Sequence, residues 1–190
     1  DLAKSFTPPV WHAEGSISNI LGTDKLGRDI LSRIMIGSRV SLALSLTIIA
    51  LGGGAGVILG LISGYSGRKV DSLIQRGVEV ILAMPTILVA LVFVFTVGRS
   101  FESVMFILSP FLAARFTRIV RGETLSVRER DYVAVAKVIG TPAWLILMKH
   151  ILPNVFNTVI VLATLEVGHL ILLEASLSFL GVGVPPPNPA

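Results

Sequence analysis

Residues 126–153, SVRERDYVAVAKVIGTPAWLILMKHILP, are the one long polar interruption between the apolar runs of the second half of the chain. Ser126 is followed three residues later by Glu129. This is the spacing of a capping box, in which each side chain bonds the free backbone N–H of the other residue. The stretch therefore predicts a helix that begins just after Ser126.

This first helix is expected to be short. Apolar side chains recur at helical spacing at Tyr132, Val135, Ala136 and Ile139, which predicts one apolar face. Gly140 is expected to end the helix, because glycine adopts the left-handed C′ conformation without steric cost. The pattern therefore predicts a forced break at Gly140.

A second helix is expected directly after the break. Thr141 can cap it and Pro142 can occupy its first position, where a missing N–H costs nothing. The helix is predicted to run to Leu152 and to meet Pro153 as the chain becomes apolar. A short amphipathic helix held rigidly at a membrane face is suited to transmit force to a partner.

Composition indicates an all-α integral membrane protein with several spans. The chain has 190 residues, 53% hydrophobic and 15% charged, with a mean hydropathy of +0.81. It has no cysteine, which excludes disulfides and cysteine-based metal sites. The net charge of +4 is explained by basic residues that flank apolar spans and orient them, so no nucleic-acid partner is expected.

Four membrane helices are expected, with the lipid bilayer as their partner. Their predicted ranges are 40–67, 78–98, 103–120 and 155–173. Proline inside a membrane helix is tolerated and tends to kink it, so Pro85 is expected to bend the second span. Pro110 interrupts the third span, and Arg115 and Arg118 near its end are expected to reach the membrane interface.

The whole chain, 1–190, is predicted to form a single transmembrane domain. Its parts are an extracytoplasmic segment with an interfacial helix at 28–39 (1–39), three spans (40–120), a cytoplasmic loop (121–153), and the fourth span with an extracytoplasmic proline-rich tail (154–190). The sides follow from ten Lys and Arg on the side of the loop against six on the other. Because these residues are enriched on the cytoplasmic side, the loop is predicted to be cytoplasmic.

Four glycines in the first predicted span lie four residues apart, at Gly52, Gly56, Gly60 and Gly64. This spacing places them on one helix face and allows another helix to approach closely. The GGGAGV run lacks the GxGxxG spacing and a flanking strand pattern, which argues against a phosphate-binding loop. The sequence therefore predicts a helix-packing face.

Several parts of the chain are similar to a known family. Ala136, Gly140, Leu152 and Pro153 resemble the EAA–G–I–LP loop of the membrane subunits of ABC importers. The flanking strings VRGETLSVRERDYVAVAKVIG and KHILPN, with GTDKLGRDILSR at 22–33 and LLEASLSFLGVGVPPPNP at 172–189, resemble its dipeptide/oligopeptide permease branch. The chain departs from the loop pattern at three places: Ala134 at the Glu position, Val135 at the following Ala, and His150 at the Ile.

The resemblance implies a type I ABC importer permease bundle in which the loop is a coupling helix seated in a groove of the ATPase. The implied coupling residues are Tyr132, Ala134, Val135, Ala136, Gly140, Leu152 and Pro153. The implied partners are a second homologous permease subunit, two ABC ATPase subunits and an extracytoplasmic substrate-binding protein. The resemblance also implies that four of the six family spans are present, with one before Asp1 and one after Ala190 absent.

An enzymatic role is not expected for this chain. It has no GxxxxGK[ST] loop, no HExxH and no GxSxG elbow, so ATP and Mg²⁺ would be used by the partner subunits. The resemblance implies a location in the cytoplasmic (inner) membrane. It also implies a path for dipeptides and oligopeptides, or for a related small solute such as nickel.

Three polar residues in or near the fourth span are candidates for the translocation path: Glu166, His169 and Glu174. Two of them, Glu166 and His169, share a helix face, but two ligands are too few for a metal site. The alternative function is an ion-gradient-driven secondary transporter that uses these three residues. Such a transporter would be expected to carry inverted repeats, and no internal repeat is visible. An intramembrane enzyme is a third alternative, for which no nucleophile or metal set can be assembled.

Overall fold

The high apolar content of the chain gives helices throughout. The computed structural model describes residues 5–13 and 15–181, and the tail expected at 182–190 lies outside them. Across the described ranges the regular structure is helical, with one isolated bridge between Thr23 and Asp29, which confirms the all-α prediction. Packing divides the chain into two units, Asp1–Ala43 and Leu44–Ala190, each of which is described by itself.

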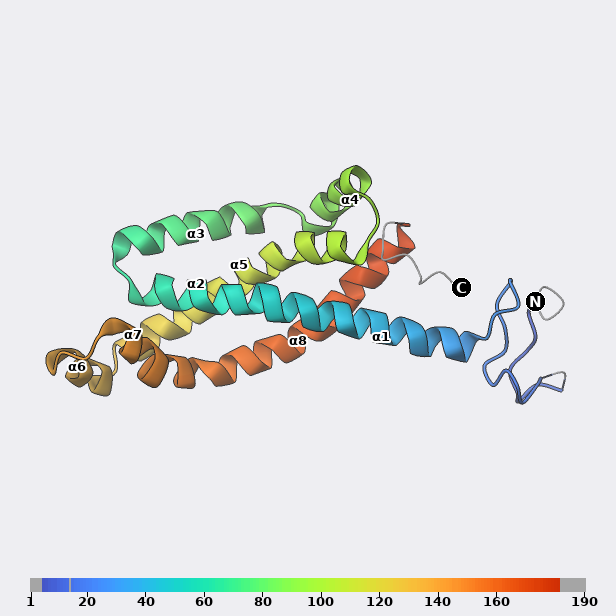
Figure 1. The fold of residues 1–190 in the computed structure, drawn as a ribbon, viewed down its shortest axis with the longest axis horizontal. Coiled ribbons are helices and arrows are strands. Elements are labelled where there is room, and N and C mark those ends of the chain that lie inside the picture. Colours follow the sequence, from blue (N-terminus) through green and yellow to red (C-terminus); the bar gives the residue numbers. More distant parts are fainter. Residues whose placement is uncertain (1–4, 14, 182–190) are drawn as a thin grey trace. The chain divides into compact units, whose positions relative to one another are not determined.

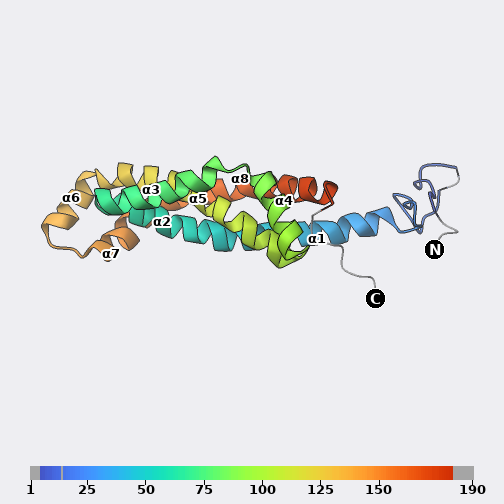
Figure 2. The same cartoon turned by 90° about the horizontal axis from the view of Figure 1, so that it is seen from above.

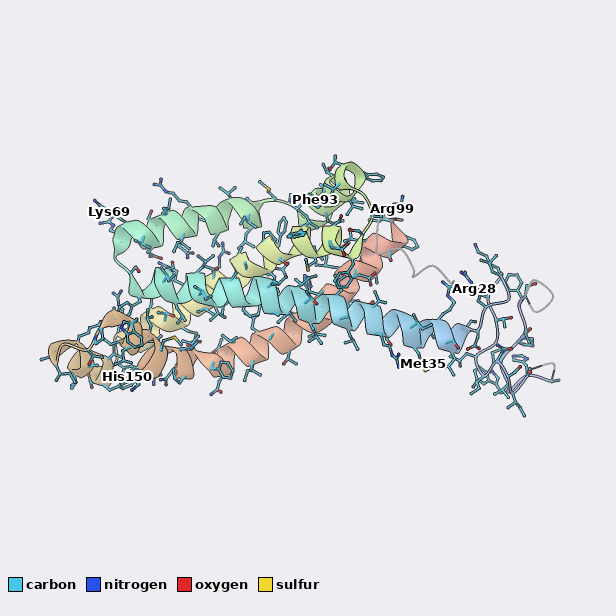
Figure 3. The ribbon with its side chains drawn as sticks, viewed as in Figure 1. Arg28, Met35, Lys69, Phe93, Arg99 and His150 are labelled. Atoms are coloured by element: carbon cyan, nitrogen blue, oxygen red, sulfur yellow. The ribbon has the colours of Figure 1, made fainter. Side chains whose placement is uncertain are left out.

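The first unit contains a loop organised around the carboxylate of Asp24. One carboxylate oxygen accepts from the backbone N–H groups of Leu26 and Arg28 at 2.8 and 3.0 Å. The other accepts from Nε of Arg28 at 2.9 Å and from Nη1 of Arg33 at 2.6 Å. Figure 3 shows Arg28 at the point where this loop meets the first helix.

The first helix begins directly after Asp29. The Asp29 carboxylate accepts the backbone N–H of Ser32 at 2.8 Å, which is the geometry of an N-cap. The helix α1 (Ile30–Ile48) continues through the π-helical turn η2 (Ile49–Gly53) into α2 (Gly54–Tyr65). Together they form one apolar helix of 36 residues. The prediction of a separate interfacial helix at 28–39 is therefore wrong, because these residues belong to the start of the long helix.

The second predicted span is broken rather than kinked. The helices α3 (Arg68–Ala83) and α4 (Thr86–Val97) meet at an angle of 80°. Pro85 has no N–H to donate and excludes the helical conformation for the residue before it, and Met84 accordingly has a ψ of 133°. The helix also begins earlier than the expected residue 78, because α3 starts directly after the extended Gly67.

The third span, α5 (Phe101–Arg128), is longer than expected and carries Pro110 inside it. The predicted capping box is wrong, because Ser126 lies within this helix. Val120, Thr124 and Val127 recur on one face of α5 and are almost fully buried, so packing carries the helix through Ser126. The side-chain cap is at the other end, where Ser100 accepts the backbone N–H of Ser103 at 3.0 Å.

The break at Gly140 is confirmed. The short helix α6 (Asp131–Val138) is followed by Gly140 with φ of +80°. The N–H of Thr141 donates to the carbonyl of Ala136 at 3.0 Å and the N–H of Gly140 to that of Lys137 at 3.1 Å. These two bonds form a Schellman motif, which satisfies carbonyls that the helix end would leave unpaired.

The second short helix is not separate from the fourth span. The elements α7 (Ala143–Ile146), η3 (Leu147–Ile151) and α8 (Leu152–Phe179) follow one another as a single apolar stretch of 37 residues. The helix therefore does not end at Leu152 as expected, and Pro153 is accommodated directly after the π-helical turn η3. Pro142 is the N-cap rather than the first helical residue, and no side chain caps this helix.

The second unit has two recognisable ends. The turn between α2 and α3 lies at the same end as α6 and α7, whereas α4 and the end of α8 lie at the other (Figures 1 and 2). Lys69 and His150 mark the first end, and Phe93 and Arg99 mark the second (Figure 3). The described residues hold three helices long and apolar enough to cross a membrane, or four if the bent α3–α4 pair is one span.

Candidate functional site

The glycine-bearing face of the long first helix lies against α5. A Cβ built on Gly52 or Gly56 would lie 2.5 Å from the backbone carbonyl oxygen of Ser109 or Ala113, respectively. On Gly60 and Gly64 it would lie 2.7 and 2.6 Å from side-chain carbons of α5. Larger side chains would hold the two helices apart, so these glycines set how closely α2 and α5 pack.

The short helix α6 is anchored in the core at this end of the unit. Val133 is fully buried and Ala136 is 5% exposed. The cluster that contains them includes residues of α2, α5, α7, η3 and α8: Leu61, Val120, Val127, Ile146, Ile151 and Val155. The expected apolar face is therefore only partly right, because the buried face of α6 is formed by Val133 and Ala136.

The opposite face of α6 is apolar and exposed. Tyr132, Val135 and Ala134 point away from the core. Val138 is 87% exposed and Ile139 is 74% exposed, immediately before the turn at Gly140. Of the two remaining residues predicted for coupling, Leu152 is half-buried and Pro153 is exposed in the first turn of α8. An exposed apolar group on a buried base is a typical protein-docking feature.

Polar contacts tie α6 to the ends of α2 and α5. Arg128, the last residue of α5, donates from Nη1 to the carbonyl oxygens of Gly64 and Tyr65 at 3.2 and 3.3 Å. The ammonium of Lys137 lies 5.5 Å from the centre of the Tyr65 ring, which is a cation–π distance. These contacts were not predicted from the sequence. They fix α6 and the end of α5 to the end of α2.

A second polar group links α3 to α5. Arg121 donates from Nε and Nη2 to the two carboxylate oxygens of Asp71 at 2.5 and 2.6 Å. The hydroxyl of Ser63 donates to the same carboxylate at 2.5 Å and accepts from Gln75 at 3.0 Å. The parallel double bond is the strongest geometry available to a guanidinium and a carboxylate.

A third polar group lies deeper, between α5 and α8. Nη1 of Arg115 lies 3.3 Å from both carboxylate oxygens of Glu166, which is 8% exposed. Arg115, which was expected to reach the membrane interface, is thus directed at a carboxylate of α8. Both residues line a small cavity with His169 and Thr86, the first residue of α4.

The three residues predicted for the path do not gather at one place. Glu166 and His169 line the same cavity. Glu174 lies about two helical turns beyond Glu166, and accepts a hydrogen bond from Ser178 at 3.3 Å. Among residues 5–13 and 15–181, no three His, Cys, Asp or Glu side chains are placed to hold a metal ion.

The sequence does contain an indication of these ion pairs. Charged residues inside apolar helices require partners, and α5 carries Arg115 and Arg121 within its length. The acids on other helices are Asp71, Glu79, Asp131, Glu166 and Glu174. Which acid meets which arginine depends on helix register and could not be read from spacing.

Comparison with known proteins agrees with this architecture. Residues 56–190 match the family model described as "Binding-protein-dependent transport system inner membrane component". The chain is 39% identical over 174 residues to the glutathione transport system permease protein GsiD of Pectobacterium atrosepticum, covering 92% of this chain and 58% of that protein.

Two further relatives are named for dipeptides. The dipeptide transport system permease protein DppC of Haemophilus influenzae is 37% identical over 182 residues, covering 96% of this chain and 62% of that protein. The probable D,D-dipeptide transport system permease protein DdpC of Escherichia coli is 33% identical over 188 residues, covering 99% and 61%. The chain thus spans roughly three fifths of the length of these relatives. Its helices and the match over most of its length show that the chain belongs to the family of inner membrane components of binding-protein-dependent transport systems.

Proposed function

We propose that this chain is part of the permease subunit of an ATP-driven importer that carries small peptides or glutathione-like solutes across the cytoplasmic membrane. The observation that carries the proposal is the helix α6 at one end of the second unit. One face of α6 is buried in the core and the other is apolar and exposed. The names of the relatives, which mention glutathione and dipeptides, support the choice of solute. The excess of Lys and Arg on the side predicted to hold α6 supports a cytoplasmic location for this end.

The proposed partners follow from this arrangement. A pair of ATPase subunits binds α6 through Tyr132, Val135 and Val138, and hydrolyses ATP with Mg²⁺, so that this chain binds no cofactor of its own. A second, homologous permease subunit completes the path, and a substrate-binding protein delivers the solute from the other side of the membrane. No nucleic acid takes part.

The contacts around α6 support a mechanical role. If α6 could move freely on its linkers, displacement by an ATPase would be absorbed locally. Val133 and Ala136 instead pack in the same cluster as Leu61 of α2 and Val120 of α5. Movement of α6 therefore displaces the ends of α2 and α5. ATP binding shifts the bundle from one state to another only if the ATPase binds one of the two states more tightly.

The alternative, an ion-gradient-driven transporter that uses Glu166, His169 and Glu174, is less well supported. The carboxylate of Glu166 is paired with Arg115. Glu174 lies about two turns away from it along α8. These positions do not suggest a continuous proton path through the three residues.

Cross-linking tests the proposal, since the chain has no native cysteine. Ala134→Cys is exposed on α6, whereas Ala136→Cys lies two residues away and is buried, which makes it a matched control. Both variants are made in the complete protein, with any cysteines outside this chain replaced, and treated in native membranes with a short thiol cross-linker. The expected result is capture of an ATPase by Ala134→Cys, with a yield that changes when ATP is added, and no capture by Ala136→Cys. Thiol labelling of Ala134→Cys from the cytoplasm without capture of an ATPase would contradict the proposal.

A further inference from the structure

The two ion pairs on α5 have different geometries. Arg121 donates from two nitrogens to the two carboxylate oxygens of Asp71, at 2.5 and 2.6 Å. Arg115 reaches Glu166 with one nitrogen, Nη1, at 3.3 Å from each oxygen. Nε and Nη2 of Arg115 have no acceptor among the described residues; the Arg115 side chain is 33% exposed and that of Glu166 is 10% exposed. The deeper pair is therefore loose and leaves most of the guanidinium donors unused.

The surroundings of this loose pair favour an anion. The cavity beside it has a volume of about 10 Å³, and its other walls are Thr86, His169 and apolar side chains of α5 and α8. That volume holds about one water molecule, so a ligand carboxylate can reach Arg115 only by displacing the carboxylate of Glu166. Thr86 also lines the cavity and begins α4 after the break at Pro85, and no side chain caps this helix end. Uncapped N–H groups at the start of a broken membrane helix favour negative charge.

We propose that Arg115 binds the free carboxylate of the transported solute, and that the Glu166 carboxylate occupies this site when no solute is present. The proposal rests on the proposed function and specifies its substrate class, a peptide with a free carboxyl terminus. Exchange of one carboxylate for another keeps the arginine charge paired throughout. It therefore avoids the cost of leaving the arginine unpaired inside the helix bundle. The released Glu166 carboxylate, next to His169, is then available to the ammonium group of a zwitterionic peptide.

This exchange predicts opposite effects of removing the two halves of one ion pair. Arg115→Lys keeps the charge but loses the planar fork, so binding of a carboxylate weakens by about tenfold or more. Glu166→Gln keeps the size of the side chain but removes the competing charge, so binding tightens by about tenfold. A pair that served only to hold α5 and α8 together would give changes of the same sign, or none. Arg118→Lys, an exposed position on the same helix, is the control and leaves binding unchanged.

The measurement is equilibrium binding of radiolabelled trialanine to the complete transporter in lipid nanodiscs, without its substrate-binding protein. N-acetyl-trialanine, which keeps the carboxylate, is expected to compete, and trialanine amide is not. Thermal unfolding of each variant separates lost binding from lost folding. Weaker binding in both variants, no binding in any variant, or competition by the amide would overturn the proposal.

The outcome is separable from that of the proposed function. Two results together would reject the carboxylate site and leave the importer assignment supported. They are capture of an ATPase by Ala134→Cys in the same preparation, and trialanine binding that neither Arg115→Lys nor Glu166→Gln changes. Failure of ATPase capture and of peptide binding in all variants rejects both.

Discussion

Arg121 and Asp71 stand 50 residues apart in the chain, and in the folded unit they form two parallel hydrogen bonds of 2.5 and 2.6 Å between α5 and α3. The pair lies at the α6 end of the second unit, where Ser63 of α2 also donates to Asp71. One carboxylate thus connects three helices. It holds the ends of α2, α3 and α5 together near α6.

Removal of either partner is expected to destabilise the protein. Asp71→Asn and Arg121→Met should each lower the free energy of unfolding by about 2 kcal/mol, because each leaves a partly buried charge without its partner. The double variant should cost less than the sum of the two, with a coupling energy of about 1 kcal/mol or more. Unfolding by SDS titration measures these values, with Arg118→Met as an exposed control. Additive losses would show that the two side chains do not interact in the membrane.

Glycine spacing gives a second prediction with a matched pair of positions. A Cβ on Gly56 would lie 2.5 Å from both the Ala113 carbonyl oxygen and the Phe116 Cβ, whereas a Cβ on Gly54 meets nothing within 4 Å. Gly56→Ala is therefore expected to cost about 1–3 kcal/mol through forced separation of α2 and α5. Gly54→Ala should be neutral or stabilising by up to about 1 kcal/mol, because alanine favours helix more than glycine does. Equal effects at the two positions in thermal unfolding would contradict the close packing of these helices.

Two buried threonines on α5 should respond in opposite directions to replacement by valine. Thr117 donates from its hydroxyl to the carbonyl oxygen of Ala113 at 2.7 Å and lies 3.3 Å from that of Gly56. The Thr124 hydroxyl is buried and has no partner among the described residues. Thr117→Val is expected to lower stability by about 1 kcal/mol, and Thr124→Val to raise it by a similar amount, since an unpaired buried hydroxyl is costly. SDS titration of both variants provides the comparison, and a loss of stability in Thr124→Val would mean that its hydroxyl is bonded.

The loop before α1 should resist acid. The backbone N–H of Arg28, together with that of Leu26 and the guanidinium groups of Arg28 and Arg33, holds the pKa of Asp24 well below its usual range. Because the folded pKa lies below the unfolded value of about 3.9, this contribution to stability is present above that value. The contribution is lost as the pH falls below the unfolded pKa and through the folded pKa.

Trp11 lies in this loop and reports its state by fluorescence once Trp144 and any tryptophan outside this chain are replaced by Phe. The emission should stay constant from pH 5.5 to about pH 4 and change only at lower pH. In Asp24→Asn the loop should already be loosened at pH 5.5, and the acid transition should become smaller. A transition centred above pH 5 in the unsubstituted loop would argue against the network around Asp24.

Prediction from sequence succeeded where a property is local. Gly140 ended the helix as expected, because a left-handed residue at that position depends only on the backbone and its nearest neighbours. Predictions failed where a local signal competed with packing. Ser126 and Glu129 have capping-box spacing, yet the buried side chains of Thr124 and Val127 continue α5 past Ser126.

Proline produced both kinds of result. Pro85 broke its span by 80°, whereas Pro110 and Pro153 lie within unbroken helical stretches. Pro153 follows the π-helical turn η3, a local adjustment that can accommodate the backbone group left unpaired by proline. The sequence contains all three prolines but does not show which of them the surrounding backbone accommodates.

The amino-acid sequence by itself determined the all-helical membrane class, the glycine face of α2 and the break after α6, because each depends on composition or on spacing within one helix. Tertiary structure alone decided that Arg121 meets Asp71, that Arg115 meets Glu166, and that Val133 rather than Tyr132 faces the core. These pairings depend on the register and rotation of helices that pack together, and a shift of one residue rotates a side chain by about 100° around its axis. The candidate carboxylate site is therefore a property of packed helices, and no single segment of the chain contains it.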